Sequence, residues 1–202
     1  GVKIDLEYFA ELKREFTERV SELEQKIYTV SGVNFNVNSP IQLSKVLFED
    51  LGLPTKGIKK TTRGFSTGVS ELEKLEGLHP VIELIKEYRE VSKLLSTYIL
   101  PLPDLAGEDG RIHTTFTQDV TATGRLSSVN PNLQNIPVRS EDGKRIRTGF
   151  VAGEGKILVS ADYAQFELRL AAALAGDTKL IEAFSQNIDI HTKTASEVLM
   201  LF

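Results

Sequence analysis

The sequence lacks cysteine and any long apolar run. None of its 202 residues is a cysteine, which excludes disulfide bonds and thiolate metal sites. No apolar run approaches the roughly 18 residues that a membrane-spanning helix needs, and no basic and apolar leader opens the chain. We therefore expect no membrane association and a reducing, cytoplasmic location.

Acidic residues are missing from one segment of a chain that is acidic overall. Hydrophobic residues make up 41% and charged residues 26%, and the net charge is −4. This profile is typical of a soluble globular protein with one or two domains. Between Asp50 and Glu71, however, all charged residues are basic: Lys56, Lys59, Lys60 and Arg63. A local basic patch favours a polyanionic partner, although a solvated charged loop remains the alternative.

Helices are predicted for most of the first hundred residues. Apolar residues recur at helical spacing over 6–30, up to Gly32, and again over 81–98. Ser39 and Pro40 form an N-cap and first turn for a further helix over 40–51. The Gly-, Thr- and Lys-rich residues 53–70 predict a loop. This pattern is also compatible with a helical bundle or coiled-coil stalk.

The pattern changes after Gly110 and predicts an α+β fold. Residues 111–128 are rich in threonine and alternating apolar side chains, and residues 144–152 and 156–162 also favour strands. Ile157, Leu158 and Val159 are consecutive apolar residues, typical of a strand that is buried on both faces. Further helices are predicted over 164–175 and 178–184, and from Asp189 onwards.

A cluster of polar residues follows the last predicted strand. Asp162 is either the N-cap of the next helix or a functional carboxylate presented at a strand end. Gln165, Glu167 and Arg169 follow, before the wholly apolar sequence LAAALA. We expect that helix to be packed on several sides, so that its polar residues either lie at a cleft or have buried partners.

These residues carry a resemblance to a known family. The sequence DYAQFELR resembles the first palm motif of family A DNA polymerases, usually D-Y-S-Q-I-E-L-R, with Ala164 and Phe166 as departures. TATGRLSSVNPNLQNIPVR is similar to the family's template–primer-binding stretch. RIRTGF and DIHTKTAS match in order, while NSPIQLSKVLFEDLGLP and STYILPLPDL resemble the thumb. Phe166 adjoins the sugar-selecting glutamate, which puts sugar selectivity in question.

The resemblance implies an incomplete right-hand polymerase fold. Residues 1–110 would form a helical thumb with the basic loop 53–70 at its tip. Residues 111–171 would form the first half of an antiparallel palm, and residues 172–202 the start of the fingers. The implied host is a bacterial or phage-infected cell.

The resemblance also implies roles for individual residues. Asp162 and the backbone carbonyl of Tyr163 would bind two Mg²⁺ ions that promote phosphoryl transfer. Gln165, Glu167 and His191 would bind deoxynucleoside triphosphates, with Glu167 excluding a 2′-hydroxyl and His191 meeting the triphosphate. Primer–template DNA would be bound by Arg125, Gln134, Asn135, Lys56, Lys59, Lys60 and Arg63.

The family's second metal-binding aspartate, in a later His-Asp motif, has no counterpart. His79, His113 and His191 precede proline, threonine and threonine. The expected partner is therefore a C-terminal polymerase fragment that carries the finger helix and this aspartate, whether the polymerase is naturally split or the chain is part of a longer one. Alternatives are a non-catalytic DNA-binding module and a single-subunit RNA polymerase. Glu167 argues against the RNA polymerase, which must admit the 2′-hydroxyl.

Overall fold

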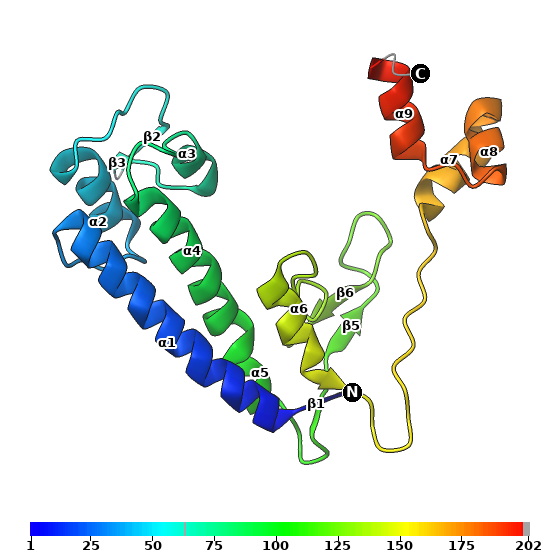
Figure 1. Ribbon diagram of the computed structural model, residues 1–202. Helices are drawn as coiled ribbons and strands as arrows, with labels where there is room; N and C mark the ends of the chain where they lie inside the picture. The colour runs from blue at the N-terminus through cyan, green and yellow to red at the C-terminus, as the bar shows by residue number, and fades with distance from the viewer. Residues whose placement is uncertain (63, 200–202) are drawn as a thin grey trace. The chain divides into compact units, whose positions relative to one another are not determined.

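The computed structural model describes residues 1–62 and 64–199. The chain divides into two units, Gly1–Ile157 and Leu158–Phe202, and each is described by itself (Figure 1). Among the described residues, no helix combines the length and apolar character that crossing a bilayer requires.

Two long helices run alongside each other in opposite directions in the first unit (Figure 1): α1 (Leu6–Ser31) and α4 (Val81–Leu94). The Asp5 carboxylate caps α1 by accepting a hydrogen bond from the Tyr8 amide at 3.0 Å. Gly32 ends the helix with a φ of 70°, a conformation that costs glycine little. Phe9 and Phe16 of α1 and Ile82 of α4 are fully buried in the core of this unit. The predicted amphipathic helices are thereby confirmed.

Shorter elements surround this hairpin. Ser39 caps its helix with Pro40 in the first turn, as predicted. The segment 53–70 contains a short β-hairpin, β2–β3, ahead of α3. The elements are α2 (Pro40–Lys45), η1 (Val46–Asp50), β2 (Lys60–Thr61), β3 (Gly64–Phe65), α3 (Val69–Glu73), η2 (Leu95–Ile99) and α5 (Pro101–Asp104).

The strands form small antiparallel sheets, which confirms the α+β class. β1 (Val2–Ile4) lies between β4 (Arg111–Ile112) and β7 (Phe150–Val151), with Val2 opposite Ile112 and Lys3 opposite Val151. β5 (Thr115–Thr117) pairs with β6 (Ser127–Val129). The strand β1 was not predicted, because three residues are too few to show an alternating pattern.

Residues 144–152 were predicted as a strand, and that prediction was wrong. Most of them belong to α6 (Glu141–Thr148), followed by the short strand β7. The Ser140 side chain caps α6 through the Gly143 amide, and acids in the first turn and bases in the last complement the helix dipole. In the helix, Ile146 is fully buried while Arg145 binds the Glu15 carboxylate of α1.

Residues 156–162 were also predicted as a strand, one buried on both faces, and this too was wrong. The segment has no helix or strand, and Ile157 and Val159 are 83% and 79% exposed. A buried strand needs a hydrogen-bonding neighbour and two covering layers. The described part of the chain provides neither for these residues.

The second unit contains three helices within its described residues: α7 (Phe166–Ala175), α8 (Thr178–Ser185) and α9 (Ile190–Leu199). Its small core consists of Ala172, Ala183, Phe184 and Ile190. The expectation that the first helix is packed on several sides was wrong, because Ala172 is the buried residue of α7 and Leu174 is 81% exposed. Within this unit α8 covers one face of α7.

Candidate active site

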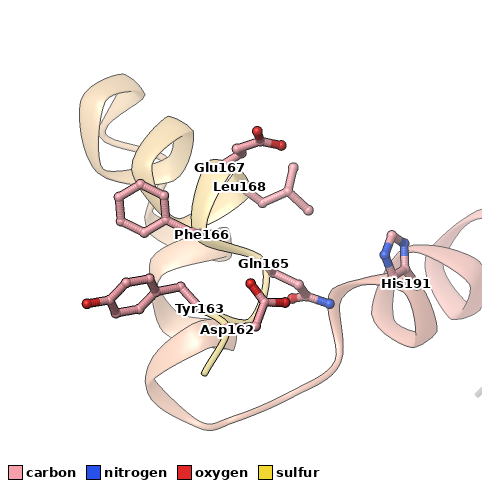
Figure 2. A pocket seen from close by; sticks show the side chains of 7 residues that line it. All are labelled: Asp162, Tyr163, Gln165, Phe166, Glu167, Leu168 and His191. Carbon is pink, nitrogen blue, oxygen red and sulfur yellow. The ribbon is translucent and has the colours of Figure 1, made fainter. Parts of the chain in front are cut away.

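An open pocket of about 500 Å³ lies in the second unit, where α7 and α9 begin (Figure 2). Asp162 and Tyr163 precede α7, while His191 comes from the first turn of α9. The pocket thus brings together the five residues expected to bind metal and nucleotide. It is lined by Asp162, Tyr163, Gln165, Phe166, Glu167, Leu168 and His191.

Asp162 does not act as the N-cap of α7. That position belongs to Gln165, in a left-handed conformation with a φ of 55° and without a side-chain capping bond. The Asp162 carboxylate is exposed, and no described residue hydrogen-bonds to it or forms an ion pair with it. The capping alternative is therefore wrong, and the carboxylate is available to a ligand.

Gln165 connects the two helices that border the pocket. Its Nε2 donates a hydrogen bond to Asp189 Oδ2 at 3.3 Å, and Asp189 Oδ1 accepts the Thr192 amide at 2.7 Å. The hydrogen bond from Thr192 chiefly holds the pKa of Asp189 below its usual range. Gln165 thereby joins the start of α7 to the capping residue of α9, two positions before His191.

Two aromatic rings lie on the side of the pocket away from His191 (Figure 2). The Tyr163 and Phe166 ring centroids are 5.7 Å apart, with the ring planes at 42°. Both side chains are exposed. Exposed aromatic faces can stack against sugars or bases. The family departure at Phe166 thus places a second ring at the pocket.

Glu167 and Arg169 take different positions on α7. The Glu167 carboxylate lines the pocket from the first turn of the helix, where a negative charge interacts favourably with the helix dipole. Arg169 Nε donates to the Ala164 carbonyl at 3.0 Å, and its guanidinium lies 4.5 Å from the Phe184 ring centroid. Arg169 therefore holds α7 against α8.

The described residues do not by themselves form a metal site. No group of three or more His, Cys, Asp or Glu side chains among them could hold a metal ion. Asp162 offers one exposed carboxylate, with the Tyr163 carbonyl next to it in the chain. Mg²⁺ requires six oxygen ligands in octahedral geometry and takes few of them from protein. One carboxylate and one carbonyl fit such a site as two of its ligands but do not complete it.

Three of the residues expected to contact DNA, Arg125, Gln134 and Asn135, lie in the first unit within or soon after the β5–β6 hairpin. Gln134 Oε1 accepts a hydrogen bond from the Ser128 backbone amide, and Gln134 Nε2 donates one to the Leu126 carbonyl, both at 3.2 Å. The Asn135 carbonyl accepts the buried Tyr98 hydroxyl. Arg125 is exposed beside the hairpin. Gln134 therefore stabilises the start of β6, because its side chain binds the backbone of both Leu126 and Ser128.

The basic loop, residues 53–70, presents its lysines to solvent. Lys56, Lys59 and Lys60 are exposed, and Lys60 Nζ lies 5.9 Å from the Phe65 ring centroid. Arg63, the fourth expected contact, lies outside the described residues.

Some residues of the pocket had not been predicted from sequence. Leu168 lines it beside Glu167, and Asp189 supports it through Gln165. Asp189 was predicted only as the start of the last helix. A search for capping residues within the matched DIHT motif would have pointed to its position, but its bond to Gln165 depends on tertiary structure.

The comparisons with known proteins identify the family. The sequence model of DNA polymerase family A matches residues 6–201. The chain belongs to this family. It is 51% identical over 197 residues to the thermostable DNA polymerase I of Thermus aquaticus, covering 97% of this chain and 24% of that protein. It is 48% identical over 198 residues to DNA polymerase I of Lactococcus lactis subsp. lactis strain IL1403, covering 98% and 22%.

A solved structure agrees with this family assignment. The POL domain of Pol1 from M. smegmatis, in complex with a DNA primer-template and dNTP, superposes with a TM-score of 0.88 at 40% identity. The match covers 100% of this chain and 36% of that one. The chain thus matches part of a polymerase domain, and it spans about a quarter of the length of the curated relatives it matches.

Proposed function

We propose that this chain supplies one side of the active site of a DNA-directed DNA polymerase, which adds deoxynucleotides to a primer 3′ end. The observation that carries the proposal is the exposed Asp162 carboxylate, unpaired among the described residues, in one pocket with Glu167 and His191. A buried or ion-paired aspartate would favour a structural role instead.

Asp162 and the Tyr163 carbonyl would hold Mg²⁺, and the remaining protein ligand would come from a C-terminal polymerase part. Two bound Mg²⁺ ions would stabilise the charge on the attacking and leaving oxygens. Exposed apolar residues support such a partner, since Leu174 and Val198 are 81% and 74% exposed, and apolar surface of this kind favours an interface.

Glu167 and His191 would orient the incoming nucleotide from two different helices. His191 lies in the first turn of α9, where the helix dipole favours an anionic triphosphate. Glu167 would occupy the space beside the sugar, so that a 2′-hydroxyl is excluded. Gln165 would act on both by fixing α9 relative to α7 through Asp189.

Primer–template DNA would be bound by the first unit. Arg125 would reach the minor groove beside the hairpin that Gln134 supports, where base pairs present nearly the same acceptors and geometry is tested rather than sequence. The basic loop 53–70, at the tip of the proposed thumb, would contact phosphates, which contribute affinity without sequence preference.

A carboxylate exchange in the assembled polymerase tests the catalytic assignment. Asp162→Asn keeps the size of the side chain but removes its charge, so we expect loss of Mg²⁺-dependent primer extension with primer–template binding retained. Asp177→Asn is the matched control, because Asp177 caps α8 by accepting the Leu180 amide and asparagine caps equally well. Extension by Asp162→Asn at the rate of Asp177→Asn would exclude this role for Asp162.

A non-catalytic DNA-binding module is the second candidate. It is favoured by the basic loop, which is built wholly within the first unit. Such a module would bind duplex DNA as the polymerase does, but it would not extend a primer with any C-terminal part. It would also gain nothing from Glu167 or His191.

A further inference from the structure

A carboxylate that phosphate binding alone does not explain directly follows the basic loop. Glu71, at the end of the loop, is only 6% exposed. An acid beside a phosphate-binding segment opposes binding by its charge. The contacts of Glu71 indicate that it supports the loop backbone instead.

The Glu71 carboxylate holds the loop backbone at two points. Its Oε2 accepts the Lys59 amide at 3.0 Å and Lys74 Nζ at 2.8 Å. Lys74 Nζ also donates to the Gly57 carbonyl at 2.9 Å. The two hydrogen bonds that the Glu71 carboxylate accepts, chiefly that from Lys74 and then that from the Lys59 amide, keep the pKa of Glu71 below its usual range. One ion pair, in which only the glutamate is buried, thus fixes the backbone on both sides of Ile58.

The rest of the loop is held by independent contacts. The guanidinium of Arg89, from α4, donates to the carbonyl of buried Thr67 and to its hydroxyl. Ile58 is 8% exposed, and Phe65 packs on Phe48 with ring centroids 5.2 Å apart. These contacts hold the described parts of the loop backbone, while the side chains of Lys56, Lys59 and Lys60 are exposed.

We propose that Glu71 is a positioning residue for DNA binding: it holds the Lys59 amide directly and the Gly57 carbonyl through Lys74, and so fixes Lys56, Lys59 and Lys60 for contact with phosphates. The inference rests on the proposed role of the loop in binding DNA. An ordered backbone loses less conformational freedom on binding, so each lysine–phosphate contact contributes more affinity.

Because Glu71 is negatively charged, an electrostatic effect and a positioning effect predict opposite changes in DNA affinity when it is removed. Glu71→Ala removes a negative charge and releases Lys74, so electrostatics alone predicts tighter DNA binding. Positioning predicts weaker binding, by about fivefold if part of the loop must then be ordered on binding. Glu73→Ala is the matched control, because Glu73 is exposed on the same helix and its loss changes the charge equally.

The experiment measures binding of a primer–template duplex by the full chain, together with amide exchange over residues 57–61 in the free protein. Glu71→Ala should weaken binding and speed exchange at Lys59. Glu71→Gln, which retains an acceptor for the Lys59 amide, should recover part of both. Glu73→Ala should bind as tightly as the parent or slightly more tightly.

Two other results would overturn the inference in distinguishable ways. If Glu71→Ala binds the duplex as tightly as Glu73→Ala while substitution of the lysines weakens binding, the loop binds DNA but Glu71 does not position it. If substitution of Lys56, Lys59 and Lys60 leaves binding unchanged, the proposed function of the loop fails, and the positioning role fails with it. Thermal unfolding of each variant shows whether the fold is retained.

Discussion

The basic loop and the candidate active site differ in where their supporting contacts come from. Contacts within the same unit hold the described loop backbone, through Glu71, Lys74 and Arg89, while the side chains of its three described lysines are exposed. In the pocket, Gln165 and Asp189 join two helices, but the Asp162 carboxylate and the surrounding apolar side chains are exposed. The proposed DNA-binding loop therefore takes its supporting contacts from its own unit, whereas the proposed catalytic centre needs a further part.

The largest expected effect is on DNA binding, when the basic side chains of the loop are removed. With Lys56, Lys59, Lys60 and Arg63 changed to alanine, the slope of log K against log salt should fall by about 4 units if all four contact phosphates. The loss should be equal for duplexes of different sequence. It is measured by titrating duplex at several salt concentrations, and an unchanged slope would contradict the role of the loop.

Glu167 tests whether the pocket selects nucleotides. In the assembled polymerase, Glu167→Ala should raise incorporation of ribonucleotides relative to deoxyribonucleotides, on the order of tenfold, because a steric barrier to one hydroxyl is removed. Gln165→Ala is the control within the pocket and should change the ratio less. Single-nucleotide incorporation kinetics measure both. Equal ratios in Glu167→Ala and the parent would assign Glu167 another role.

Arg89 tests whether the order of the loop comes from its own unit. Arg89→Ala removes two hydrogen bonds to Thr67, so we expect a loss of about 1–2 kcal/mol in unfolding free energy. Lys93→Ala, an equal charge loss at an exposed position one turn further along α4, should be nearly neutral. Chemical denaturation distinguishes them, and equal stability of the two variants would argue against this anchor.

Asp189 should give the smallest effect, a dependence on pH. Its pKa is depressed in the folded chain, chiefly by the Thr192 amide. The ionised cap therefore stabilises α9 above the ordinary aspartate pKa, and this contribution is lost as pH falls through the lower, folded value. The Thr192 amide resonance should titrate with a midpoint below about 3.9, and Asp189→Asn should abolish that titration. A midpoint at or above the ordinary value would contradict the capping geometry.

Local signals predicted much of the fold. The cap at Ser39, the helix end at Gly32 and the long amphipathic helices depend on residues close in sequence, and the structure has them. The predictions for 144–152 and 156–162 failed because strand formation depends on neighbours that the sequence pattern does not specify. Likewise β1 pairs with strands more than a hundred residues away, at Ile112 and Val151.

The site was predictable as a list of residues but not as a set of contacts. The motif match grouped Asp162, Glu167 and His191, which the structure places in one pocket, and their roles stay predictions. The bonds of Gln165 to Asp189 and of Glu71 to Lys59 were not predicted. They join polar side chains to groups whose positions tertiary packing decides, and neither has a sequence signature.

Primer extension by the purified chain, alone and with a C-terminal polymerase part that carries the finger helix and the second aspartate, tests the central claim most directly. One carboxylate and one carbonyl cannot complete a site for two Mg²⁺ ions, so we expect no extension by the chain alone. With the C-terminal part we expect Mg²⁺-dependent extension that Asp162→Asn abolishes. Extension by the chain alone, free of any partner, would contradict the account.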